Sequence, residues 1–213
     1  MNILVTAGPT QEYIDDVRYI TSPSTGKMGF AVAEVFAASG HTVNLVTGPV
    51  ALADPVGVRV TRVTTAVEMH AAVMQLIGSV EVVVMTAAVG DYRPAERFQG
   101  KRKRTGGKLL LELVENPDIL REVGELGGSR ILVGFAVESS SPRQGALEKL
   151  RKKNLDFIVL NAPSAFGADV TSVDIIDRAE RTIPLRGITK RAVAERLCEM
   201  VEAFGRSRKG GGA

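Results

Sequence analysis

Apolar positions along the chain fall into two recurring patterns, short continuous runs and longer stretches with helical spacing. The short runs are rich in Val, Ile and Leu and predict buried strands at residues 2–6, 42–47, 58–60, 80–85, 131–135 and 157–160. The longer stretches predict helices at residues 27–39, 66–77, 117–125, 142–154 and 189–204. Because strands and helices alternate, the pattern predicts β-α-β units and a parallel sheet with helices on both faces.

Three segments depart from this alternation. Strand patterns at 172–176 and 182–185 predict an antiparallel pair at the edge of the sheet. Residues 92–115 predict a small lobe that acts as a mobile basic flap. The polar residues 11–25 predict a loop that leads into the first helix. The expected fold is therefore α/β, a doubly wound, mostly parallel Rossmann-like sheet with a small antiparallel edge and flap.

The domain organisation follows from the same pattern. We find no internal repeat and no linker between domains, so a single nucleotide-binding domain is expected over residues 1–205. The last residues, 206–213, are rich in Gly, Arg and Lys and are expected to form a disordered tail.

Composition narrows the function classes. The 213 residues are 45% hydrophobic, which is enough for one core, and 27 basic against 24 acidic residues are too balanced for a dedicated nucleic-acid binder. The single cysteine, Cys198, excludes an internal disulfide, fits a reducing cytosol and is expected in the core. No apolar run is long enough to cross a bilayer, so we expect a cytoplasmic protein without membrane contact. The chain has one cysteine and two histidines, His41 and His70, so it offers almost no ligands for a zinc site.

Candidate binding residues follow two of the predicted strands. Gly8 lies in the tight turn after the first strand, where backbone approaches a ligand closely, although the G-x-G-x-x-G spacing is absent. After strand 80–85, the small residues Ala87 and Ala88 leave space, and Asp91 supplies a carboxylate that suits a metal ion. The carboxyl edge of a doubly wound sheet is where ligands bind.

Two predicted helix starts suit an anion. The first is the corner formed by Ser24, Thr25, Gly26 and Lys27, which is not a Walker A loop because the required earlier glycine is missing. The second follows Asn116, which is expected to cap a helix whose first position is Pro117. Solvation of the Lys27 ammonium is the competing interpretation for the first corner.

Positive charge and one aromatic residue complete the candidate site. Lys101 begins a run of four basic residues, which is either an anion-binding loop or a solvated one. Lys149 and Lys153 are four residues apart and therefore lie on one helix face. Phe135 follows a strand, where it either stacks on a base or belongs to the core.

The chain resembles the phosphopantothenoylcysteine synthetase family over nearly its full length. The motifs that carry the resemblance appear in order along the chain, namely LVTAGPTQEYIDDVRYI, STGKMGFAVAE, TAAVGDYRP, GKRKR, LELVENPDIL, VGFAVES and KLRKKNLDFIVLN. The resemblance implies a ligase of coenzyme A biosynthesis that uses CTP and Mg²⁺ or another divalent cation. Such an enzyme activates 4′-phosphopantothenate as an acyl-cytidylate, which the amine of cysteine then attacks. It further implies a homodimer that works with a separate or fused flavin-dependent decarboxylase.

The resemblance also implies roles for individual residues. Asp91 matches the aspartate that contacts the nucleotide or its metal, and Lys101 matches the loop lysine that stabilises the reacting phosphate. Arg18 matches an arginine near the dimer contact and the acid substrate. The nucleotide-contacting residues are matched by Pro117, Asp118, Ile119, Leu120, Phe135, Lys149 and Lys153.

One position departs from the family pattern. The family has an asparagine, which helps to bind and turn over the acyl-cytidylate, where this chain has Ser22, followed by Pro23. A serine hydroxyl does not present both an amide donor and a carbonyl. The alternative function is therefore a CTP-binding relative with reduced or altered ligase activity. An NAD-dependent Rossmann enzyme is a third hypothesis, which the missing glycine fingerprint disfavours.

Overall fold

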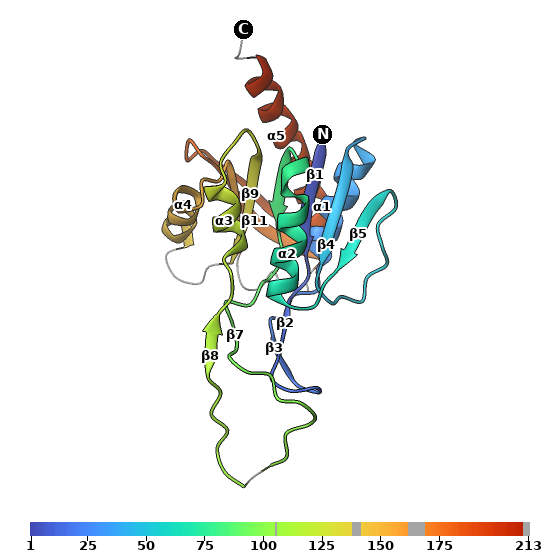
Figure 1. Ribbon diagram of the computed structural model, residues 1–213. Coiled ribbons are helices and arrows are strands. Elements are labelled where there is room, and N and C mark those ends of the chain that lie inside the picture. Colours follow the sequence, from blue (N-terminus) through green and yellow to red (C-terminus); the bar gives the residue numbers. More distant parts are fainter. Residues whose placement is uncertain (105, 138–141, 162–168, 211–213) are drawn as a thin grey trace.

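The computed structural model describes residues 1–104, 106–137, 142–161 and 169–210. Within these residues, an eight-stranded sheet has the order β12-β11-β10-β9-β6-β1-β4-β5 (Figure 1). Its strands are β1 (Asn2–Ala7), β4 (Thr42–Thr47), β5 (Val58–Arg62), β6 (Val82–Met85), β9 (Ile131–Val137), β10 (Phe157–Asn161), β11 (Val170–Asp177) and β12 (Thr182–Thr189). The six strands from β10 to β5 are parallel, and β11 and β12 form the predicted antiparallel edge. The doubly wound fold is thereby confirmed, and its strand order reverses between β1 and β6.

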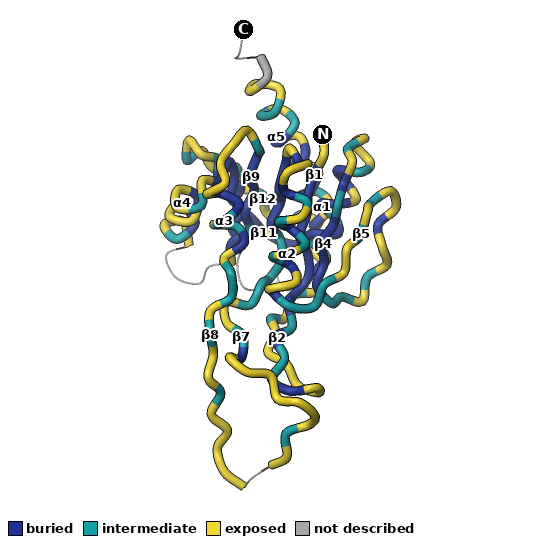
Figure 2. The backbone as a smooth tube through the Cα atoms, viewed as in Figure 1, coloured by how far each residue is buried: buried dark blue, intermediate teal, exposed yellow. Residues whose placement is uncertain are grey.

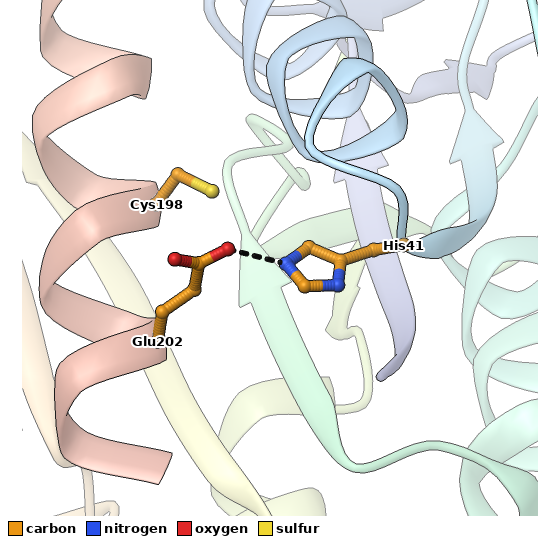
Figure 3. A group of neighbouring side chains, drawn as sticks. All are labelled: His41, Cys198 and Glu202. Atoms are coloured by element: carbon orange, nitrogen blue, oxygen red, sulfur yellow. Dashed lines mark hydrogen bonds and ion pairs between the residues drawn. The ribbon is translucent and has the colours of Figure 1, made fainter. Parts of the chain in front are cut away.

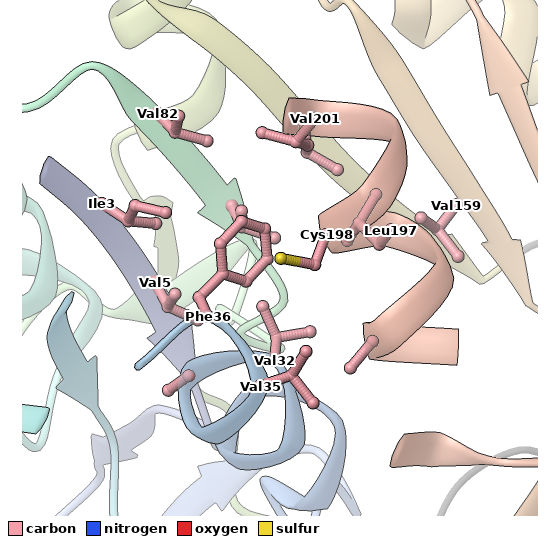
Figure 4. Close-up of a cluster of buried hydrophobic side chains, with 14 of the residues drawn as sticks. Ile3, Val5, Val32, Val35, Phe36, Val82, Val159, Leu197, Cys198 and Val201 are labelled. Atoms are coloured by element: carbon pink, nitrogen blue, oxygen red, sulfur yellow. The ribbon is translucent and has the colours of Figure 1, made fainter. Parts of the chain in front are cut away.

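Helices cover both faces of this sheet and bury two apolar clusters. Helices α1 (Lys27–Ala38) and α5 (Lys190–Gly210) pack on one face, where Phe36, Leu197 and Cys198 belong to one cluster with residues of β1, β6 and β10 (Figure 4). The opposite face carries α2 (Ala66–Leu76), the 3₁₀ turn η1 (Ile77–Ser79), α3 (Ile119–Glu125) and α4 (Pro142–Lys152). Cys198 is 4% exposed, which confirms its prediction as a core residue.

Two small hairpins project from the same end of the body (Figure 1). One pairs β2 (Gln11–Tyr13) with β3 (Tyr19–Thr21), and the other pairs β7 (Tyr92–Pro94) with β8 (Leu113–Glu115). The described residues between β7 and β8 are mostly exposed (Figure 2) and correspond to the predicted flap, whose mobility stays a prediction.

The prediction of a plain loop over 11–25 is wrong, because Asp15 closes a hairpin there. Its buried carboxylate accepts the backbone N–H groups of Val17 and Arg18 at 2.9 and 2.8 Å. These two bonds shape the turn between β2 and β3, and nothing in the apolar pattern announces them.

The C-terminal end also differs from its prediction. Residues 206–210 were expected in a disordered tail, yet α5 continues to Gly210, and residues 211–213 lie outside the described residues. The guanidinium of Arg208 donates to the carboxylate of Asp156 at 2.8 Å, and Asp156 is 2% exposed. This buried anchor holds the end of the helix against the body, which polar composition alone does not reveal. None of the described helices has the length and apolar character needed to span a bilayer.

Candidate functional site

A pocket of about 750 Å³ opens where β6, β9 and β10 end and where α1 begins. Among the residues that the sequence nominated, it is lined by Ser24, Gly26, Lys27, Ala87, Ala88, Asp91, Asn116, Pro117, Asp118, Ile119, Leu120, Phe135, Lys149 and Lys153. The pocket therefore lies beside the reversal of strand order, at the edge that the fold predicts.

Two threonines fix the loop that carries Asp91. Thr86 Oγ1 donates to the Thr6 carbonyl at 2.6 Å, and the backbone N–H of Gly90 donates to Thr10 Oγ1 at 2.9 Å. The loop after β6 is thus bonded to β1 itself and to the loop that follows β1. Asp91 follows directly, exposed at the rim of the pocket, where its carboxylate is open to a ligand.

Helix α1 begins at the pocket without a side-chain cap. Gly26 holds its N-cap position at φ 77°, a conformation that favours glycine, and no side chain accepts from the first turn. In contrast, Thr65 and Asp118 cap α2 and α3. Lys27, the first residue of α1, pairs with the carboxylate of Asp169 at 2.6 Å. The hydrogen bond from Lys27 holds the pKa of Asp169 below its usual range.

The opposite wall combines α3 and α4. The prediction of Asn116 as the helix cap is wrong, because Asp118 caps α3 by accepting the backbone N–H of Arg121 at 3.2 Å. The amide of Asn116 instead donates to the Gly90 carbonyl at 2.8 Å. Lys153 pairs with Asp118 at 2.7 Å, so one carboxylate both caps the helix and orients a lysine.

Asn161 and Lys190 line the pocket, although the sequence did not nominate them. Asn161 ends β10, and Lys190 is the first residue of α5 and only 9% exposed. Burial lowers the pKa of Lys190, and the nearby positive charge of Lys27 lowers it further. Asn161 could have been found from its place at the end of a predicted strand. For Lys190, the sequence offers no signal other than its position directly after the helix cap Thr189. Phe135 lines the pocket and also packs on the core, and its stacking on a base stays a prediction.

Residues 1–204 match the family model described as the DNA/pantothenate metabolism flavoprotein C-terminal domain. The chain belongs to this family. It is 42% identical to the coenzyme A biosynthesis bifunctional protein CoaBC of Bacillus subtilis, over 86% of the chain and 47% of that protein. It is 46% identical to CoaBC of Vibrio cholerae, over 81% of the chain and 44% of that protein. The chain therefore spans about half the length of the curated relatives it matches.

Solved structures of the family share the whole fold. A crystal structure of the C-terminal domain of a CoaBC protein superposes with a TM-score of 0.85 at 38% identity, covering 97% of this chain and 96% of that one. The DNA/pantothenate metabolism flavoprotein from Streptococcus pneumoniae gives a TM-score of 0.82 at 26% identity, covering 96% and 99%. The family resemblance and the Rossmann-like fold are confirmed.

Four nominated residues do not line the pocket of this family member. Arg18 and Lys101 lie together in a separate basic depression, where Arg18 is paired with the buried Asp15. Gly8 faces Val50, since a Cβ there would lie 2.9 Å from Val50 Cγ1. The hydroxyl of Ser22 is buried and has no hydrogen-bond partner among the described residues.

Among the described residues, one group of side chains that could hold a metal ion lies outside the pocket. His41, Cys198 and Glu202 place their ligand atoms within 4.8 Å of one another, between α5 and the turn after α1 (Figure 3). His41 Nε2 and Glu202 Oε1 form a 3.0 Å pair, and the Cys198 thiol donates to Ser39 Oγ at 3.6 Å. Burial raises the pKa of the Cys198 thiol, which opposes the thiolate that a metal needs. These contacts show that the three side chains link α5 to the end of α1.

Proposed function

We propose that this chain is the synthetase part of a CTP-dependent ligase that joins 4′-phosphopantothenate to cysteine in coenzyme A biosynthesis. The observation that carries the proposal is the convergence of Lys27, Lys149, Lys153 and Lys190 on one pocket that also presents Asp91 and Phe135. Matches to coenzyme A biosynthesis proteins at 42% and 46% identity support the same reaction.

The reaction explains why so many cations surround one cavity. A carboxylate attacks the α-phosphate of a nucleotide, so two anions must meet while pyrophosphate leaves with the electrons of the broken P–O bond. The lysines of α1, α4 and α5 neutralise this charge, and Phe135 offers a face to the base. The amine of cysteine then attacks the acyl carbon, the bond between this carbon and the phosphate oxygen breaks, CMP leaves with the electrons of that bond, and the nitrogen releases a proton.

Asp91 fits the divalent cation that the family implies. It is an exposed carboxylate on the pocket rim, and Mg²⁺ commonly takes one or two protein carboxylates and completes its shell with substrate phosphates and water. Asp118 is less suitable, because its Oδ1 already caps α3 and pairs with the positively charged Lys153. When bound, the cation would supply charge neutralisation to the phosphates.

Partners and location belong to the same proposal. We expect a homodimer, with the edge strands β11 and β12 and the Arg18 region as contact surfaces. The bifunctional relatives support cooperation with a fused or separate decarboxylase. A cytoplasmic location agrees with the single, reduced cysteine.

A complete substrate assay tests the ligase. The protein is incubated with 4′-phosphopantothenate, cysteine, Mg²⁺ and either CTP or ATP, and products are followed by mass spectrometry. We expect CMP, pyrophosphate and the amide with CTP, and much slower turnover with ATP. Absence of all three products at high enzyme concentration would reject the proposed activity.

Ser22 motivates the alternative, a CTP-binding relative with reduced or altered ligase activity. Its buried hydroxyl lacks a partner within the described part of the chain, which is a cost that an amide with more bonding options could remove. This alternative predicts CTP binding with slow release of pyrophosphate, and faster turnover in Ser22→Asn. If Ser22→Asn is no faster than the unchanged protein, the alternative is rejected.

A further inference from the structure

Two neighbouring helices begin at the pocket, and each begins with a lysine. Lys27 is the first residue of α1 and Lys190 is the first residue of α5, and the two helices pack side by side on one face of the sheet. Both side chains line the pocket, and the positive charge of Lys27 contributes to lowering the pKa of Lys190. A lysine at a helix N-terminus is unfavourable for the helix itself, so this paired placement calls for another explanation.

Asp169 contacts both members of this pair of cations. Asp169 contacts Lys27 through its carboxylate at 2.6 Å, and its carbonyl accepts the backbone N–H of Lys190 at 3.3 Å. The two lysines therefore exceed the charge of the aspartate by one. Lys190 is 9% exposed, so its ammonium is largely desolvated and gains more from a polyanion than a surface lysine does.

Asp169 itself is held loosely. Its side chain is 83% exposed, against 37% for Lys27, and pairs between exposed groups contribute little free energy. A ligand phosphate that carries more charge and more acceptor oxygens than a carboxylate can therefore displace it.

We propose that Lys27 and Lys190 form a seat for the terminal phosphates of the nucleotide and for the pyrophosphate that leaves, and that Asp169 fills this seat until the ligand displaces it. The inference rests on the proposed function and deepens it, because it assigns the terminal phosphates to Lys27 and Lys190 in particular and makes Asp169 an internal competitor. A purely structural Lys27–Asp169 link would predict no gain of affinity when Asp169 is removed.

Binding of inorganic pyrophosphate, measured by calorimetry on the whole chain, tests the proposal. Lys190→Gln should weaken binding by about tenfold or more, as expected for the loss of a charge-assisted contact. Lys190→Arg should retain most of the affinity, and Lys152→Gln, on the exposed face of α4, controls for net charge. Asp169→Asn should strengthen binding by about two- to fivefold, which is the range for releasing an exposed ion pair.

Two comparisons make the result decisive. Asp54→Asn removes a similar exposed pair, with Arg62 at 2.6 Å, outside the pocket, and should leave pyrophosphate affinity unchanged. In a Lys27→Gln background, Asp169→Asn should lose its effect, because the competitor acts through Lys27. Unchanged or weaker binding in Asp169→Asn, or equal losses in Lys190→Gln and Lys152→Gln, would overturn the proposal. Since neither 4′-phosphopantothenate nor cysteine is present, failure of the ligase assay is a separate outcome.

Discussion

At the residue scale, the lysines show that membership in a sequence motif does not determine whether a residue lines the pocket. Lys101 belongs to a motif of the family but lies outside the pocket, whereas Lys190 belongs to no motif that we identified and lines it. Lys149 and Lys153 were found because helical spacing places them on one face. Lys190 was missed because its proximity to Lys27 arises from the packing of α1 against α5, two elements far apart in the sequence.

Lys101→Gln should reduce turnover without loss of stability. The side chain is exposed on a loop, so its removal leaves the folded state nearly unchanged. If the loop delivers this ammonium to the reacting phosphate, kcat should fall about 100-fold, as for loss of one preorganised charge-stabilising donor. The rate is measured at saturating substrates and the thermal midpoint by calorimetry. Lys103→Gln, on the same loop and also exposed, is the control, and an equal effect of the two substitutions would contradict a specific role for Lys101.

Asp15 should make stability depend on acid. The side-chain hydrogen bond from Arg18 holds the pKa of Asp15 well below its usual range, so the native state binds this proton less readily than the unfolded state. Its stabilisation is therefore complete above a pH of about 4 and is lost as pH falls through the lower native value. Urea unfolding between about pH 5 and pH 2 should show a shallower pH dependence in Asp15→Asn than in the unchanged protein. Parallel curves would contradict this assignment.

At the scale of elements, buried strands were the most predictable part of the fold. Strands such as β1 and β4 follow the apolar runs closely, because both faces of the sheet are covered. The ends of helices and strands were less predictable where a hydrogen bond to a residue far away in the sequence determines them. Asn116 looks like a helix cap locally, but its amide is taken by Gly90 on the loop after β6, so the cap moves to Asp118.

Gly29 is where α1 meets β1, and it should not tolerate a methyl group. A Cβ at this position would lie 2.4 Å from Thr86 Oγ1 and 2.5 Å from Ala7 Cβ. Gly29→Ala should therefore destabilise the protein by about 1–3 kcal/mol through overpacking, measured by urea unfolding. Gly78→Ala is the matched control, because a Cβ there meets no atom within 4 Å. Equal stabilities of the two variants would show that α1 shifts freely on the sheet.

At the scale of the whole molecule, the strand order determines where chemistry gathers. The carboxyl ends of β6, β9 and β10 lie beside the start of α1 because the strand order of the sheet reverses between β1 and β6. This edge was predictable from the alternation of strands and helices. The contact between the turn after β2 and the basic loop was not, because it joins two polar segments without any repeating pattern.

The turn after β2 tethers the basic loop, and breaking this tether should expose the loop to trypsin. Asp16 accepts the backbone N–H of Gly100 at 2.6 Å and the guanidinium of Arg97 at 3.0 Å. Asp16→Asn weakens both contacts, since a neutral amide replaces the charged acceptor, and the loop should open more often. Under native conditions, cleavage after residues 101–104, followed by mass spectrometry, should accelerate about three- to tenfold, which corresponds to roughly 1 kcal/mol in the opening equilibrium.

Asp54→Asn, which breaks an exposed ion pair elsewhere, is the control and should be cleaved at the original rate. If Asp16→Asn also cleaves at that rate, the loop is held by other contacts, and its approach to the pocket does not depend on this hairpin.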